Sequence, residues 1–168
     1  MIENFLNKIT YGDCLDVMKQ LPDKCIDLVL TDPPYGIGMD KNAGLSDKYT
    51  AKNWDSERPS KIFFDEIIRV SKNQIIFGGN YFVDLLPLGC WDLWDKRCNI
   101  VPRRTFADGE LIYKSIKSPL RIYYFLWDGF LQQDMKNKEQ RFHPTQKPVK
   151  LIETILRDYT PNLAGGGC

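Results

Sequence analysis

Four consecutive residues, Asp32-Pro33-Pro34-Tyr35, have the side chains and the stiffness to hold an amine beside an aromatic ring. They follow residues 25–31, a short apolar run that predicts a buried parallel strand. Asp32 is therefore expected at the carboxyl end of a strand, where open α/β sheets bind ligands. Each proline fixes φ, lacks an N–H and favours an extended conformation for the residue before it. The tetrad should therefore present preorganised acceptors.

An exocyclic amino group on a flipped-out base suits these groups. Asp32 and the Pro33 carbonyl can accept its N–H groups while Tyr35 stacks on the base. The amine is a poor nucleophile because its lone pair is delocalised into the heterocycle. Acceptors that stabilise the positive charge developing on the nitrogen would lower the barrier to its attack. The alternative is a plain strand-to-loop turn, because Asp, Pro and Tyr are ordinary loop residues.

Further motifs accompany the tetrad. They are Gly12-Asp13-Cys14-Leu15-Asp16, Ile76-Phe77-Gly78-Gly79-Asn80-Tyr81 and His143-Pro144-Thr145-Gln146-Lys147-Pro148. With these motifs the chain resembles the amino-methylating DNA methyltransferases, of the permuted class in which the catalytic tetrad precedes the main cofactor motif. The resemblance spans residues 12–159, in the order that this class uses.

The resemblance implies transfer of a methyl group from S-adenosylmethionine to a flipped base of double-stranded DNA. Adenine N6 is preferred over cytosine N4, because the tetrad begins with Asp rather than Ser. The implied catalytic residues are Asp32, Pro33, Pro34 and Tyr35. The implied cofactor-binding residues are Asp13, Asp32, His143, Thr145, Gln146 and Lys147.

Some of these residues also have architectural interpretations. Asp13 suits the N-cap of a helix, which is compatible with a role in cofactor binding. Pro148 suits the first turn of a helix, and Thr145 could cap that helix. His143 has no acidic neighbour in the motif, so it is a poor candidate for a general base.

Strands and helices alternate along the chain, which predicts an α/β fold. Strands are expected over 8–11, 26–31, 74–77, 91–94, 110–114 and 121–127, and helices over 15–21, 61–71, 80–87 and 148–159. The resemblance implies a doubly wound Rossmann-like methyltransferase sheet in an incomplete form. Family members continue into an Asp-Pro-Phe-x-Gly-Ser-Gly type cofactor loop and its strands, whereas this chain stops at 162–168. The missing strands would leave an open sheet edge.

Composition predicts one soluble domain over residues 1–168, with 43% hydrophobic and 27% charged residues. A mobile loop is expected at 36–60, which is polar and aperiodic, and a minimal target-recognition region around 130–142. No apolar run reaches the about 20 residues of a membrane span, and no signal peptide is apparent. Five cysteines without a Cys-x-x-Cys pair and one histidine make a poor metal site. The expected location is the cytoplasm, without a bound metal.

Charge is distributed unevenly along the chain. Residues 1–95 contain 10 Lys and Arg against 15 Asp and Glu, whereas residues 96–168 contain 13 against 7. Such asymmetry indicates that one face meets nucleic-acid phosphates. The candidate contacts are Lys96, Arg97, Arg103, Arg104, Lys114, Lys117, Arg121, Lys136, Lys138 and Arg141.

Two functions of different classes remain open at this point, and a third, amino methylation of RNA or of a protein glutamine, is disfavoured by the basic second half of the chain and by the DNA-type motif at His143 to Pro148. The first is a site-specific adenine methyltransferase. The second is a catalytically inactive remnant or split-enzyme fragment that binds DNA or a partner chain, since an open sheet edge favours a homodimer or a complementing chain.

Overall fold

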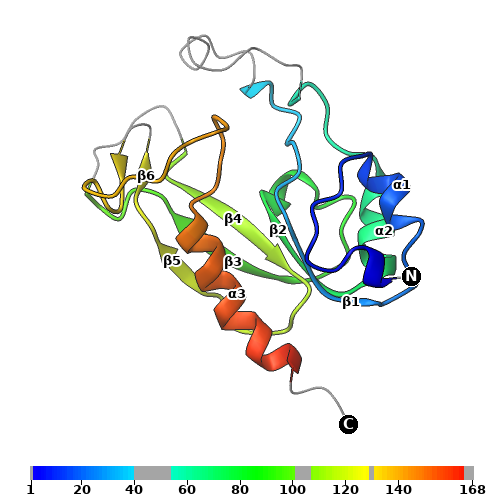
Figure 1. Cartoon of the computed structure of the whole chain (residues 1–168). Coiled ribbons are helices and arrows are strands. Elements are labelled where there is room, and N and C mark those ends of the chain that lie inside the picture. Colours follow the sequence, from blue (N-terminus) through cyan, green and yellow to red (C-terminus); the bar gives the residue numbers. More distant parts are fainter. Residues whose placement is uncertain (1, 40–53, 101–106, 129–130, 165–168) are drawn as a thin grey trace.

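One curled sheet organises the fold (Figure 1). The computed structural model describes residues 2–39, 54–100, 107–128 and 131–164. The strands of the sheet are β1 (Ile26–Thr31), β2 (Ser71–Phe77), β3 (Cys90–Asp95), β4 (Gly109–Lys114) and β5 (Ile122–Tyr124), in the order β1-β2-β4-β3-β5. β1 is parallel to β2 and β5 to β3, whereas β4 is antiparallel to both of its neighbours. The expected α/β fold is confirmed, and the mixed sheet is compatible with a Rossmann-like arrangement.

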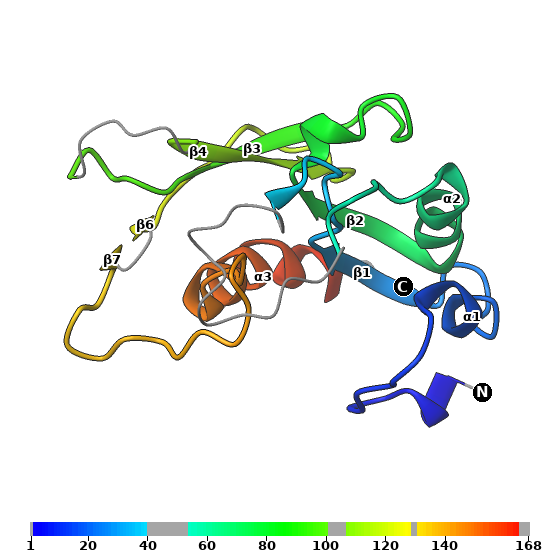
Figure 2. The same cartoon turned by 90° about the horizontal axis from the view of Figure 1, so that it is seen from above.

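Helices cover opposite faces of the sheet (Figure 2). Successive strand residues point to opposite faces. Ile75 and Phe77 of β2 share a core with Leu151 and Ile155 of α3 (Val149–Ala164). Ile76, between them, lies instead in a core with Phe64 of α2 (Lys61–Val70). α1 (Cys14–Met18) packs against α2, so the helices enclose β1 and β2 between two apolar layers.

A side chain of α2 joins it to α1. Phe64, Ile67 and Val70 are buried at intervals of three residues, which directs one face of α2 to the core. Arg69 points the other way and donates to the backbone carbonyls of Met18 and Leu21, at 2.8 and 2.9 Å. The Met18 carbonyl also accepts from the Leu21 N–H at 2.9 Å, so the guanidinium gives it a second donor and gives the Leu21 carbonyl a donor beyond the end of α1.

α3 is fixed to the sheet by a buried polar cluster. Lys114 Nζ lies 2.5 Å from Asp92 Oδ1 and donates to the Tyr159 hydroxyl at 2.9 Å. The Tyr159 hydroxyl donates to Asp92 Oδ2 at 2.5 Å. At the same end of the helix, the Tyr123 hydroxyl donates to Asp158 at 3.0 Å. β3, β4, β5 and α3 are therefore joined by specific contacts as well as by apolar packing.

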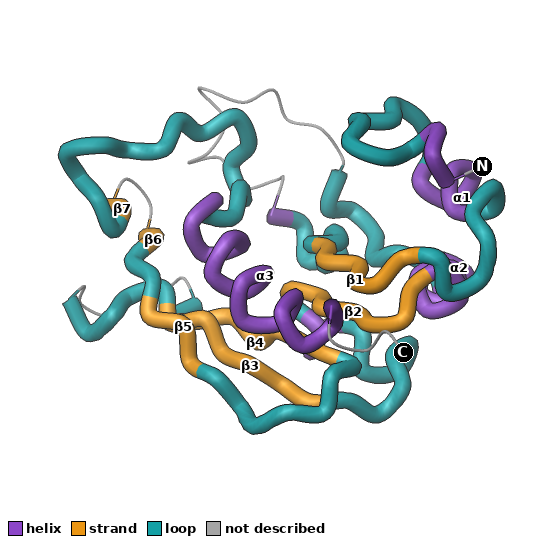
Figure 3. The backbone as a smooth tube through the Cα atoms, turned by 60° about the horizontal axis from the view of Figure 1, so that its bottom comes forward, coloured by secondary structure: helices purple, strands orange, loops and turns teal. Residues whose placement is uncertain are grey.

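Several expected elements differ from the structure. Residues 8–11 form no strand. The expected helix over 80–87 is only a short 3-10 turn, η4 (Gly79–Tyr81), because left-handed Gly78 starts a tight turn and Pro87 follows soon after. The expected strand over 121–127 ends as β5 at Tyr124. The chain then leaves the sheet and forms a separate hairpin, β6 (Trp127–Asp128) with β7 (Leu131–Gln132), seen apart from the main sheet in Figure 3.

β1 is an edge strand of this sheet and is half-buried, whereas a buried strand was expected. Another 3-10 turn, η1 (Ile2–Asn4), stands near the N-terminus. Among the described residues, no helix has the length and apolar character needed to cross a bilayer.

Candidate active site

Asp32 lies where the sequence places it, directly after the last residue of β1. Thr31 pairs with Ile76 of β2, so the carboxyl ends of these parallel strands lie side by side. Residues after both strands, the tetrad and Gly78-Gly79, therefore meet at one edge of the sheet. The Asp32 side chain is 31% exposed, which leaves its carboxylate accessible.

The tetrad is held in place by Asp55, a residue that the sequence analysis did not single out. Asp55 is 1% exposed, and its carboxylate accepts hydrogen bonds from the backbone N–H groups of Tyr35, Gly36 and Met39 at 2.8 to 2.9 Å. Its carbonyl also accepts from the N–H of Gly38 at 3.1 Å. A buried carboxylate with several N–H donors fixes the backbone that follows the tetrad.

Most of the expected mobile loop, residues 40–53, lies outside the described residues. Its described ends are held by contacts. Besides the Asp55 bonds, Arg58 donates to Asp84 at 2.6 and 2.8 Å.

Tyr35 turns inward toward the end of β2. A Cβ on Gly78 would come within 2.3 Å of the Tyr35 ring, and Gly78 has φ +63°, so glycine suits this position on both counts. The ring of Tyr35 stacks on Tyr81, with centroids 4.8 Å apart and planes 16° apart, and meets Phe82 edge-on. The absence of a side chain at Gly78 thus allows the Tyr35 ring to lie close to the backbone at the end of β2.

A charged cluster surrounds Asp32, formed by Asp32, Tyr35, Lys96, Glu110 and Lys147; we refer to it as the Asp32 cluster. Lys147 Nζ lies 2.9 Å from Asp32 Oδ2 and 3.0 Å from Glu110 Oε1. The Tyr35 hydroxyl lies 2.8 Å from Asp32 Oδ1 and 2.6 Å from Glu110 Oε1. Lys96 lies 2.6 Å from Glu110 Oε2. The cluster joins the end of β1, the start of β4 and the segment before α3.

Burial and charge set the protonation states of two cluster members. Burial, followed by the carboxylates of Glu110 and Asp32, raises the pKa of the Tyr35 phenol far above its usual value. The hydroxyl therefore keeps its proton. Burial alone would raise the pKa of Glu110, but Lys147, Lys96 and the Tyr35 hydrogen bond together outweigh it and hold that pKa below its usual range. Glu110 is therefore an anion at neutral pH.

Of the cofactor residues implied by the resemblance, the structure brings Asp32 and Lys147 together. The Gln146 side chain instead bridges backbone groups of its own loop, accepting from Phe142 N–H and donating to the Gln140 carbonyl at 3.0 and 3.2 Å. The Thr145 hydroxyl lies 3.1 Å from His143 Nδ1. Part of the motif is thus architectural, as the sequence suggested.

The start of α3 is capped by a different residue from the one expected. The Val149 N–H donates to the Glu139 carboxylate at 2.9 Å, whereas the Thr145 hydroxyl turns to His143. Thr145 precedes the helix by too many residues to reach its first free N–H groups, so Thr145 as the cap was wrong. Pro148 directly precedes α3, and its carbonyl accepts from Ile152 at 3.2 Å.

Asp13 is the N-cap of α1, where its carboxylate accepts from the Leu15 N–H at 2.8 Å. His143 is exposed and meets the ring of Trp54, at a centroid distance of 4.8 Å. The Trp54 contact joins the described end of residues 36–60 to the His143 motif.

The basic residues expected to contact phosphate differ in exposure and in pairing. Lys114 has 0% side-chain exposure and pairs with Asp92, so Lys114 as a phosphate contact was wrong. Lys96 and Arg97 form ion pairs with Glu110 and Asp108. Arg103 and Arg104 lie outside the described residues. The exposed candidates are Lys117, Arg121, Lys136 and Lys138, whereas Arg141 is half-buried and lies 4.3 Å from the centroid of the Trp127 ring.

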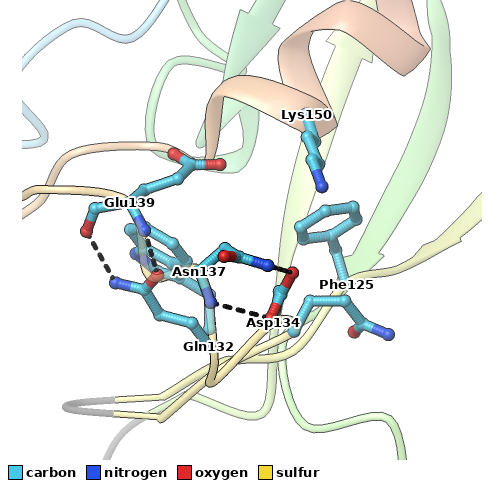
Figure 4. A pocket seen from close by; sticks show the side chains of 8 residues that line it. Phe125, Gln132, Asp134, Asn137, Glu139 and Lys150 are labelled. Atoms are coloured by element: carbon cyan, nitrogen blue, oxygen red, sulfur yellow. Dashed lines mark hydrogen bonds between the residues drawn. The ribbon is translucent and has the colours of Figure 1, made fainter.

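Several side chains between Gln132 and Glu139 line a pocket that is separate from the Asp32 cluster (Figure 4). Hydrogen bonds of polar side chains stabilise the conformation of this segment. Gln132 donates to the Glu139 carbonyl at 3.0 Å and accepts from the Glu139 N–H at 2.7 Å, and Asp134 accepts from Asn137. Phe125 and Lys150 also line the pocket. None of the lining residues belongs to the Asp32 cluster.

The sequence alone did not reveal Glu110 or Asp55. Glu110 is 75 residues from Tyr35 and Asp55 is 20 residues from it, and neither stands in a recognisable motif. An acidic residue at the start of a β-strand, where burial is costly, is the only local signal for Glu110.

Comparisons with known proteins find similarity to methyltransferases. The chain is 33% identical over 85 residues to the type II methyltransferase M.BamHI of Bacillus amyloliquefaciens, covering 49% of this chain and 18% of that protein. It is 50% identical over 34 residues to the type II methyltransferase M.HinfI of Haemophilus influenzae, covering 20% of this chain and 10% of that protein. It is 24% identical over 176 residues to "Putative methylase YubD" of Escherichia coli (strain K12), covering 94% of this chain and 72% of that protein.

No family model matches the chain. The matched segments span less than a fifth of M.BamHI and of M.HinfI. The chain is thus similar in sequence to segments of type II methyltransferases.

Proposed function

We propose that this chain transfers a methyl group from S-adenosylmethionine to the exocyclic N6 of an adenine in double-stranded DNA. The observation that favours it most is the position of Asp32. A partly exposed carboxylate, followed by two prolines, stands at the carboxyl end of β1 on a backbone fixed by buried Asp55. The sequence similarity to type II methyltransferases agrees with this chemistry.

In this proposal Asp32 and the Pro33 carbonyl accept the hydrogen bonds of the adenine amine. As the nitrogen attacks the methyl group, the bond from that carbon to the sulfonium sulfur breaks, and the sulfur leaves as a neutral thioether with the electron pair. The nitrogen gains positive charge until it releases a proton to water, and an anion held beside it stabilises that charge in the transition state. Pro34 and the Asp55 bonds keep the acceptors in place, so that little reorganisation accompanies the attack.

S-adenosylmethionine would supply an electrophilic methyl group on a sulfonium. Its methionine part has an amino group and a carboxylate, and Lys147 of the Asp32 cluster offers the charge that complements the carboxylate. The donor set at this edge of the sheet therefore fits the group. The rest of the cofactor is proposed to be held by the other residues that the resemblance implies, which are Asp13, His143, Thr145 and Gln146.

The flipped base is proposed to stack on Tyr35. In the structure the Tyr35 ring is covered by Tyr81, which is 38% exposed on the short turn η4. We infer that the base takes the place of Tyr81 against Tyr35. An aromatic stack of this kind contributes about 1–3 kcal/mol per base.

DNA phosphates are proposed to meet the exposed lysines and arginine of the second half of the chain, and residues 130–142 to contact the target sequence. The relatives do not favour the alternative of a chain that binds DNA or a partner without catalysing a reaction.

The test is transfer of tritium from methyl-labelled S-adenosylmethionine to DNA, with RNA and protein as competing acceptors. We expect label in DNA with the wild-type chain and a loss of about a thousand-fold with Asp32→Asn, which keeps the shape of the side chain but not its charge. Asp65→Asn removes an exposed carboxylate of α2 that pairs with Lys61, away from the proposed site, and is the matched control; it should keep wild-type labelling. Equal labelling by wild type and Asp32→Asn contradicts the proposal.

A further inference from the structure

One buried carboxylate in the Asp32 cluster has no part in the reaction as described so far. We propose that Glu110 is a positioning residue, which draws the Tyr35 hydroxyl and the Lys147 ammonium away from Asp32 as the amine of the base arrives. The inference rests on the proposed function, because it assigns a task within the same site.

The geometry offers both donors two acceptors at nearly equal distances. The Tyr35 hydroxyl is 2.8 Å from Asp32 and 2.6 Å from Glu110. A phenol has one proton, so the hydroxyl donates to one carboxylate at a time. Lys147 Nζ is 2.9 Å from Asp32 and 3.0 Å from Glu110. Small movements therefore suffice to transfer either donor from one carboxylate to the other.

The amine needs the carboxylate that these donors occupy. A neutral amine competes poorly with an ammonium ion for Asp32 unless the ammonium has another anion close by. Glu110 is that anion. It is 8% exposed, so water replaces few of its hydrogen bonds, and Lys96 holds its other oxygen at 2.6 Å.

The charge of Glu110 also matters in the transition state. Positive charge develops on the amine nitrogen, and an ammonium ion on Asp32 would oppose it. With Glu110 ionised, Lys147 has a counter-ion of its own, and Asp32 can face the developing charge. Glu110 thus acts through Asp32 and does not itself need to touch the base.

Two substitutions separate this role from simple packing. Glu110→Gln keeps the volume and loses the charge, whereas Glu110→Asp keeps the charge and loses a methylene. Positioning by charge predicts that Asp supports catalysis better than Gln. Packing alone predicts the opposite order, because the shorter side chain leaves a cavity.

The experiment measures single-turnover transfer from tritiated S-adenosylmethionine to unmethylated plasmid DNA, together with the cofactor affinity. At saturating cofactor we expect Glu110→Gln to slow transfer by about ten-fold or more and Glu110→Asp by less. Glu66→Gln is the control, since Glu66 pairs with Arg69 of α2 outside the cluster. Transfer by Glu110→Gln at the wild-type rate, or slower transfer by Glu110→Asp than by Glu110→Gln, overturns the proposal.

A second readout does not depend on activity. In protein labelled with ¹³C at Tyr Cζ, the Tyr35 signal is identified with Tyr35→Phe and compared between wild type and the Glu110 variants. We expect a shift in both variants, because each alters the acceptor of the Tyr35 hydroxyl. An unchanged Tyr35 signal overturns the positioning role. If the wild-type chain transfers no label, the proposed function fails, and the Tyr35 signal alone tests the contact between Tyr35 and Glu110. If Glu110→Gln does not fold, the signal of Glu110→Asp tests that contact.

Discussion

At the residue scale, Asp55 determines the shape of the tetrad. Its carboxylate gathers the N–H groups of Tyr35, Gly36 and Met39, which lie in a segment without regular secondary structure. Asp55→Ala should lower the free energy of unfolding by about 2–4 kcal/mol, because these N–H groups lose a charged acceptor. Urea denaturation measures the change.

The matched control for Asp55 is Asp134→Ala. Asp134 likewise accepts from two backbone N–H groups, of Lys136 and Asn137, but these bonds are exposed to water. Its loss should cost less than about 1 kcal/mol, because water can replace it. Equal costs for both substitutions would show that burial of Asp55 is not what stabilises the tetrad.

The residue types in the sequence motifs predicted two members of this site, Asp32 and Lys147. Asp32 and Lys147 stand in motifs with local signatures, and the structure brings their side chains together. Glu110 and Asp55 could not be predicted, because their roles depend on partners that only the folded sheet brings near. Thr145 was expected as a cap for α3 from its type alone, but Glu139 supplies the acceptor.

At the element scale, the junction between β1 and β2 depends on Gly78. A methyl group there would overlap the Tyr35 ring, at 2.3 Å. The alanine would also have to adopt the left-handed backbone conformation of Gly78. Gly78→Ala should destabilise the protein by about 1–3 kcal/mol through overpacking alone. Gly12→Ala is the control, since a Cβ on Gly12 meets nothing within 4 Å. Similar thermal midpoints for both variants would contradict this account of the junction.

The attachment of α3 to the sheet is a second property of the elements. Asp92→Asn leaves Lys114 buried without its anion, which should cost about 3–5 kcal/mol in the free energy of unfolding. Asp16→Asn removes an exposed pair with Lys19 and should cost at most about 1 kcal/mol. Thermal unfolding followed by circular dichroism compares them. A small effect of Asp92→Asn would mean that apolar packing alone holds α3.

Periodicity predicted the elements that have one clear face. β1, α2, β2 and β4 appear within a few residues of their expected bounds. It failed where short-range signals competed with packing. Residues 80–87 have helical spacing, yet the tight turn at Gly78 and the burial of Phe82 leave room for only a 3-10 turn. Residues 121–127 have strand character, but the chain leaves the sheet after Tyr124.

At the scale of the whole molecule, the uneven charge of the sequence is partly neutralised inside the fold. Lys96, Lys114 and Lys147 each lie beside a carboxylate of the sheet or its edge. The count of basic residues therefore overstates the positive charge that is free for DNA. Linear sequence does not show which lysines are paired, because the partners are distant along the chain.

Glu110 also links the stability of the whole chain to pH. Its pKa is lower in the folded protein than the value of about 4.3 of an unfolded chain. The stabilisation is complete above the unfolded value and is lost as the pH falls through the folded value. Wild-type stability should therefore decline in acid, and the decline should be shallower in Glu110→Gln. Urea titrations between about pH 3 and pH 6 measure both slopes; equal slopes would contradict this linkage.

The central claim is that Asp32 directs a methyl group to the amine of adenine. The most direct measurement incubates DNA with S-adenosylmethionine and the chain, digests it to nucleosides and quantifies methylated bases by mass spectrometry. The account predicts N6-methyladenine with the wild-type chain and about a thousand-fold less with Asp32→Asn. N4-methylcytosine as the sole product, or no methylated base at all with the folded wild-type chain, would contradict it.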